Sequence, residues 1–211
     1  MRKTLFYIVD VFAERKYSGN QLAVFMPGHH FSGEEMQQVA REINFSETTF
    51  IMSDKPQKGG YKVRIFTPGE EVPFAGHPTL GTAYIIAKKI LHTKPLQLNL
   101  DLKIGQIPVS FESIDKNSDR LWMKQIEPQF QSYFEAKKLT EVLNLSESDI
   151  DNRFPVQQVS TGLPFIIVPL KSLDAIKKCQ IDKSKYFALI RDIDAKAILV
   201  FAPQTYDPAH Q

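Results

Sequence analysis

Two segments of this sequence share the same order of elements, and that order restricts the folds that the chain can adopt. Residues 18–27 form a glycine turn, an apolar strand and a proline, and residues 161–169 repeat this order. Each segment is followed by a predicted helix and then by a further strand. Self-similarity of this kind indicates a duplicated unit. A common strand–helix–strand rhythm without duplication is the alternative interpretation.

Hydrophobic periodicity predicts alternating strands and helices along the chain. The clearest helix covers residues 33–43, because Ser32 and Glu35 have the spacing of a capping box and apolar side chains follow at helical spacing. Strands are predicted at residues 4–12, 21–26, 48–52, 61–65, 96–102, 107–111, 120–124, 156–160, 164–168 and 197–201. Further helices are predicted from Pro78, from a second capping box at Ser132 and Glu135 to about Asn144, and over residues 173–179 and 184–192.

Charge and composition argue against several classes of function. The 26 basic and 24 acidic residues give a net charge of +2, which does not indicate a nucleic-acid partner or an anionic membrane. No apolar run approaches the ~20 residues that span a bilayer, and Asp10 interrupts the apolar N-terminal segment. We therefore expect a first strand rather than a signal peptide, and a cytoplasmic location. Cys179 is the only cysteine and is expected to be a structural thiol.

The densest group of candidate site residues is the segment Gly76-His77-Pro78-Thr79-Leu80-Gly81-Thr82-Ala83. Gly76 would let a ligand approach the backbone closely, and the free N–H groups of a helix start favour an anion such as a carboxylate. His77 could donate a hydrogen bond or transfer a proton, although a structural histidine is the alternative. No His/Cys cluster has the spacing of metal ligands, so we expect no metal.

A second candidate is Glu47, which lies where an apolar strand begins in Asn44-Phe45-Ser46-Glu47-Thr48-Thr49-Phe50. A carboxylate held against apolar neighbours has a raised pKa and can serve as a general acid or base. A solvated loop glutamate is the alternative interpretation. The sequence alone does not separate the two.

Taken together, these segments resemble the PhzF (phenazine-biosynthesis-like) family. The resemblance rests on the turn Gly19-Asn20, on residues 44–50, on Arg64-Ile65-Phe66-Thr67-Pro68, on residues 74–83 and on Ser160-Thr161-Gly162-Leu163-Pro164. It implies an α+β, diaminopimelate-epimerase-like fold of two similar domains, each a curved, mostly antiparallel sheet around a central helix. The expected domains are residues 1–118 and residues 119–211, and the second is expected to be incomplete.

The resemblance also implies a function. It implies an isomerase or epimerase that needs no metal or organic cofactor and moves a proton on a small carboxylate-bearing substrate. Glu47 would be the general acid and base, and Ser46, Gly76 and His77 would line the substrate site. A homodimer is implied as well. One residue can carry the proton between two carbons if the substrate is held still.

One part of the sequence departs from the family. The family's second half carries an acidic-Pro-Ala-Thr-Gly-Ser-Ala helix, and Asp207-Pro208-Ala209 matches only its beginning. We assign this tripeptide no role, because no Thr-Gly-Ser follows it. A sheet face without its covering helix would favour association. The alternative to an isomerase is therefore a non-catalytic binding or interaction protein, or an inactive fragment, that retains the fold.

Overall fold

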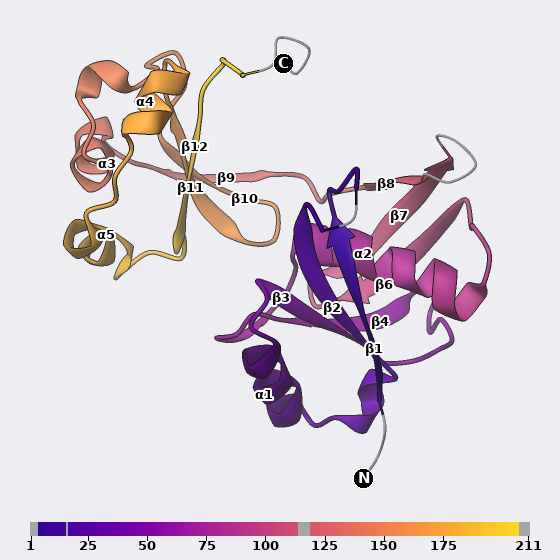
Figure 1. The fold of residues 1–211 in the computed structure, drawn as a ribbon. Coiled ribbons are helices and arrows are strands. Elements are labelled where there is room, and N and C mark those ends of the chain that lie inside the picture. Colours follow the sequence, from indigo (N-terminus) through magenta and orange to yellow (C-terminus); the bar gives the residue numbers. More distant parts are fainter. Residues whose placement is uncertain (1–3, 16, 114–118, 207–211) are drawn as a thin grey trace. The chain divides into compact units, whose positions relative to one another are not determined.

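The computed structural model describes residues 4–15, 17–113 and 119–206, and the chain divides into two compact units, Met1–Ile126 and Glu127–Gln211 (Figure 1). The strands of the first unit are β1 (Leu5–Val11), β2 (Asn20–Met26), β3 (Glu47–Ile51), β4 (Tyr61–Phe66), β5 (Glu71–Val72), β6 (Gln97–Leu102), β7 (Gly105–Ser113) and β8 (Asp119–Met123). Its helices are η1 (Gly28–His30), α1 (Gly33–Ile43), α2 (Gly76–Ile86) and a π-helical turn, η2 (Ala87–Leu91). The first unit extends beyond the boundary expected after residue 118, because β8 pairs with β7.

The first unit is a curled sheet built around α2. Its strand order is β1-β2-β3-β4-β6-β7-β8, with β5 beside β4. Most neighbouring strands are antiparallel, but β4 is parallel to β6, and β2 is parallel to β3, to which it is joined through α1. Helix α2 contacts β1, β2, β3, β6 and β8, so strands from both ends of the sheet reach the same helix (Figure 1). The expected curved sheet around a central helix is therefore confirmed for this unit.

Helix α1 has the bounds and the cap that the sequence predicts. The Ser32 hydroxyl accepts a hydrogen bond from the backbone N–H of Glu35 at 3.1 Å, and the Glu35 carboxylate accepts one from the N–H of Ser32 at 2.7 Å. The helix ends at Asn44, whose left-handed backbone has a φ of 56°. Its side chains Met36 and Ala40 are fully buried against the outer face of the sheet. This reciprocal cap is local, which is why the sequence alone locates it.

Helix α2 is fixed to the inner face of the sheet by very close packing. It begins at Gly76, two residues before the predicted start at Pro78. A Cβ atom at Gly81 would lie 2.7 Å from Leu22 Cδ2, so only glycine allows the helix to approach β2 this closely. A buried hydrogen bond of 2.8 Å joins the hydroxyls of Thr82 and Thr49, which ties α2 to β3. These contacts set where the start of α2 lies relative to the start of β3.

The second unit repeats the strand pairing of the first. Its elements are β9 (Gln129–Tyr133), α3 (Ala136–Leu143), η3 (Glu147–Asp149), β10 (Gln157–Ser160), β11 (Pro164–Pro169), α4 (Leu173–Lys178), α5 (Lys183–Ile190) and β12 (Ala197–Phe201). Strand β11 is antiparallel to β10 and parallel to β12, with helices between β11 and β12, as β2 is antiparallel to β1 and parallel to β3. The predicted duplication is confirmed in this pairing order.

One face of the second sheet carries the helices. Ile166 and Val168 of β11 are fully buried in a core to which α3, α4 and α5 contribute side chains. Alternate residues of a strand point to opposite faces. The opposite face of β12 therefore includes Leu199 and Phe201, whose side chains are 44% and 40% exposed. Within the described part of this unit, no helix takes the place that α2 has in the first unit.

The structure differs from the sequence-based predictions at the start of the second unit. The second capping box is wrong, because Ser132 lies in β9 and Glu135, at the cap position of α3, makes no side-chain cap hydrogen bond. Strand β9 itself was not predicted, since its five side chains are all exposed and show no alternation. The tripeptide Asp207-Pro208-Ala209 lies outside the described residues.

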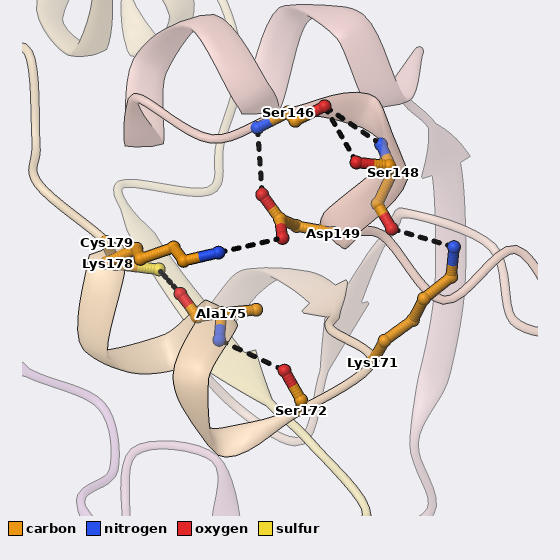
Figure 2. A network of polar contacts seen from close by, with 8 residues as sticks. All are labelled: Ser146, Ser148, Asp149, Lys171, Ser172, Ala175, Lys178 and Cys179. Atoms are coloured by element: carbon orange, nitrogen blue, oxygen red, sulfur yellow. Dashed lines mark hydrogen bonds and ion pairs between the residues drawn. The ribbon is translucent and has the colours of Figure 1, made fainter.

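The surroundings of Cys179 agree with a structural thiol. Figure 2 shows its Sγ donating a hydrogen bond to the carbonyl of Ala175 at 3.5 Å, within helix α4 and its end. Nearby, the Asp149 carboxylate accepts the N–H of Ser146 at 3.0 Å and faces Lys178 Nζ at 3.7 Å. Burial, and to a smaller extent the charge of Asp149, raise the pKa of the Cys179 thiol. A raised pKa disfavours the thiolate and with it a nucleophilic role.

Candidate active site

The fold brings the four predicted site residues to one place in the first unit. Glu47 is the first residue of β3 and Ser46 directly precedes it. Gly76 and His77 are the first two residues of α2. Because α2 packs on β2 and β3, its start lies beside the start of β3. Residues that are about thirty positions apart in sequence therefore meet at the end of one helix.

Glu47 and His77 face each other without completing a hydrogen bond. Glu47 Oε2 and His77 Nε2 are 3.4 Å apart, and the two side chains are 18% and 7% exposed. Both atoms are buried and have no hydrogen-bond partner among the described residues. Leaving buried polar atoms unpaired costs free energy, so such a pair calls for an explanation. A polar or reacting group bound beside these atoms, within hydrogen-bond reach of each, would satisfy both.

A further side chain, Asn20, joins this group although the sequence analysis does not place it in the site. Its Nδ2 lies 3.2 Å from His77 Nδ1, and its Oδ1 accepts a hydrogen bond from the Ser46 hydroxyl at 3.3 Å. Asn20 is the first residue of β2 and pairs with Val11. In the sequence, Asn20 was noted only as part of the turn Gly19-Asn20 that contributes to the family resemblance. No chemical role was assigned to it.

The start of α2 has no side-chain cap. Its cap residue, Ala75, makes no side-chain hydrogen bond to the helix, and the first turn contains no acidic residue. A Cβ atom at Gly76 would meet one neighbour within 4 Å, Met123 Cε at 3.4 Å, which is an ordinary contact. The uncapped N–H groups and the helix dipole favour an anion at such a position. A carboxylate fits this end of the helix.

Burial moves the two titratable groups in opposite directions. It raises the pKa of Glu47 above the ordinary value of 4.5. It lowers the pKa of His77 below 6.5, and a hydrogen bond with the backbone of Gln21 offsets part of this effect. Near neutral pH the imidazole is therefore neutral, and Glu47 is a stronger base than an exposed glutamate. Such a pair is suited to proton transfer.

The raised pKa predicts that Glu47→Gln stabilises the fold. An unfolded glutamate ionises near 4.5, whereas the folded state holds its proton to higher pH, so this group lowers stability as pH rises through that window. At pH 7 the variant should have a higher melting temperature than the wild type, and near pH 4 the difference should vanish. Thermal melts at both pH values measure this. The exposed Glu70→Gln is the matched control, and an equal gain from it would contradict the prediction.

The described part of the chain was also searched for metal-binding clusters and for membrane-spanning helices. Among residues 4–15, 17–113 and 119–206, no three His, Cys, Asp or Glu side chains lie together as a candidate metal site. In the same ranges, no helix is both long and apolar enough to cross a membrane.

Comparison with known proteins identifies relatives along nearly the whole chain. The family model described as "Phenazine biosynthesis-like protein" matches residues 9–210. An uncharacterized isomerase from Pasteurella multocida is 32% identical over 193 residues, which are 88% of this chain and 62% of that protein. The trans-2,3-dihydro-3-hydroxyanthranilate isomerase of Pseudomonas aeruginosa is 35% identical over 171 residues, which are 81% of this chain and 59% of the enzyme. The chain thus spans less than two thirds of the length of these relatives.

Solved structures agree with this assignment. A Bacillus anthracis phenazine biosynthesis protein of the PhzF family has a TM-score of 0.83 at 27% identity, covering 98% of this chain and 69% of that one. A predicted epimerase from Pseudomonas aeruginosa has a TM-score of 0.82 at 26% identity, covering 94% of this chain and 70% of that one. A hydroxyproline epimerase from Agrobacterium vitis, at 10% identity and a TM-score of 0.51, shares the fold alone. The α+β epimerase-like fold is therefore confirmed.

Proposed function

Because this chain belongs to the phenazine biosynthesis-like (PhzC-PhzF) family, we propose that its first unit carries the proton-transfer site of an isomerase or epimerase, with Glu47 as general acid and base. One observation carries the proposal: Glu47 Oε2 and His77 Nε2 are buried, face each other at 3.4 Å and have no hydrogen-bond partner among the described residues. Relatives that are 32% and 35% identical are named isomerases.

The substrate in this proposal is a small molecule with a carboxylate. Its negative group would lie at the uncapped start of α2, where the N–H groups near Gly76 favour an anion. The Ser46 hydroxyl supplies a further polar contact at the same end of the site. Fixing the carboxylate holds the reacting carbon near Glu47, which lowers the entropy cost of the reaction.

The proposed step moves a single proton. Glu47 removes a proton from a carbon beside an acidifying group, so a C–H bond breaks and a carboxyl O–H bond forms. The electron pair delocalises into the substrate, where His77 can donate a hydrogen bond to the developing charge. Glu47 then returns the proton to a neighbouring carbon and is regenerated. No electrons leave the substrate, so the step balances without a redox cofactor.

One carboxylate favours isomerisation over epimerisation. When the proton returns to a neighbouring carbon on the same side of the substrate, Glu47 alone is sufficient. Inverting one carbon instead needs an acid on the opposite face of the substrate. Among the described residues of the first unit, the face-to-face pair at this site contains one carboxylate, Glu47. We therefore propose an allylic or ring-based proton shift on a carboxylic acid.

Proton–deuterium exchange tests this proposal directly. The protein is incubated in heavy water with a panel of small cyclic and amino-acid carboxylates, and NMR follows the loss of each substrate C–H signal. Incorporation at a carbon beside an acidifying group supports the proposal. A folded sample that binds a carboxylate but exchanges no proton of any substrate on the panel would contradict it. The cytoplasmic location and the homodimer stay predictions.

A non-catalytic binding or interaction protein is the second candidate. It is favoured by the exposed side chains Leu199 and Phe201 on the face of β12 that the described helices of the second unit leave open. Exposed apolar groups of this kind are typical of interaction surfaces. Binding of a carboxylate without exchange, in a protein whose spectrum shows a folded state, would support this candidate.

A further inference from the structure

Asn20 makes two contacts that the proposed proton transfer leaves without a role. It lies between Ser46 and His77, with its amide oxygen 3.3 Å from the Ser46 hydroxyl and its amide nitrogen 3.2 Å from His77 Nδ1. The amide is partly buried and stands at the start of β2, while His77 is 57 positions further along the chain. A short side chain on a strand thus holds the ring at the start of a helix.

The direction of the Ser46 hydrogen bond indicates which end of the amide faces the imidazole. The hydroxyl donates to Oδ1, so the NH₂ group is directed at His77 Nδ1. An amide NH₂ group can only donate, so the facing ring nitrogen must accept. In a neutral imidazole one nitrogen accepts and the other carries the proton. The proton of His77 is then on Nε2, the nitrogen that faces Glu47 Oε2.

We propose that Asn20 is a positioning residue that holds His77 with its proton on Nε2, so that this N–H faces Glu47 and is available to a substrate atom bound beside the two side chains. The consequence for catalysis rests on the proposed function, but the position of the proton does not. The ring also has the hydrogen bond with the backbone of Gln21 described above, and this bond offers a competing arrangement in which Nδ1–H donates to the Gln21 carbonyl. It would place the proton on Nδ1 and leave an Nε2 lone pair facing Glu47.

An isosteric change separates these two arrangements. In Asn20→Asp the facing oxygen can only accept, so the ring should move its proton to Nδ1. In Asn20→Ala no amide donates to Nδ1, so the share of rings with a protonated Nε2 should fall. In Ser46→Ala the amide loses the contact that orients it, so a mixture of tautomers is expected. Asn152→Asp makes the same chemical change at an exposed position and should leave His77 unchanged.

The test is long-range ¹⁵N–¹H NMR of the imidazole rings in the full chain at about pH 8, where histidine is neutral. The His77 signals are assigned by their absence in His77→Gln. The proposal expects a protonated Nε2 in the wild type and a protonated Nδ1 in Asn20→Asp. A wild-type ring with its proton on Nδ1, or an unchanged tautomer in both Asn20 variants, would overturn it. The wild-type tautomer tests the proposal even if neither Asn20 variant folds.

Kinetics complete the test. If Asn20 acts through His77, Asn20→Ala should lower the maximal exchange rate and change substrate binding little, whereas a lost substrate contact would weaken binding. Failure of the proposed function gives a different result, because the wild type would then exchange nothing while its ring still carried the proton on Nε2. The two proposals can therefore fail separately.

Discussion

Glu47→Gln is expected to lower the rate of substrate proton exchange by about 10²–10⁴-fold, the usual contribution of a general base. Glutamine keeps the length and shape of the side chain and can still face His77 Nε2, which lies 3.4 Å from Glu47 Oε2. It cannot take a proton from carbon. The loss should therefore appear in the maximal rate, with little change in the affinity for the substrate. Deuterium incorporation measured by NMR and binding measured by calorimetry give the two quantities.

Two further variants make this result specific to Glu47. Glu70→Gln removes an exposed carboxylate of the same unit and should leave the exchange rate unchanged. Glu47→Asp keeps the carboxylate but shortens its reach, so a partial loss is expected. Exchange that persists in Glu47→Gln at close to the wild-type rate would exclude Glu47 as the base. The same variant is expected to be more stable at pH 7, so a loss of activity would not come from unfolding.

The sequence predicted those parts of the fold that depend on local patterns. Helix α1 has its predicted bounds because the capping box of Ser32 and Glu35 lies within four residues. The duplication was visible because a glycine turn, an apolar strand and a proline recur in order, and the pairing of β10, β11 and β12 follows that of β1, β2 and β3. Similar local reasoning failed at Ser132, which lies in β9. There, pairing with β10 decides the structure rather than a local cap.

The four candidate site residues were chosen from their local motifs together with the family resemblance. Glu47 begins β3 with Ser46 just before it, and Gly76 and His77 begin α2. Asn20 cannot be assigned in this way, since its role depends on a contact with a ring that is 57 positions away. The distance between Glu47 and His77 cannot be predicted from the sequence either, because the packing of α2 on the sheet determines it. The sequence identified candidate side chains, and the fold determines the distances between them.

The second large effect is expected from Gly19→Ala, which should destabilise the first unit by about 2–4 kcal/mol. Gly19 has a φ of +83°, and a Cβ atom there would lie 2.3 Å from the backbone oxygen of Val11. Left-handed backbone alone costs a non-glycine residue about 1–2 kcal/mol, and the clash with β1 adds to this. Urea denaturation followed by the fluorescence of Trp122, the only tryptophan, reports on this unit.

Gly59→Ala is the matched control, because Gly59 has a nearly equal φ of +88° and its Cβ would meet nothing closer than 4.0 Å. It should cost only the backbone term of about 1–2 kcal/mol. The difference between the variants then measures the clash with Val11. Because Asn20 follows Gly19 and contacts His77, Gly19→Ala should also lower the exchange rate of the molecules that remain folded, while Gly59→Ala should not. Equal costs and equal exchange rates in the two variants would show that the close approach of Gly19 to β1 does not position Asn20.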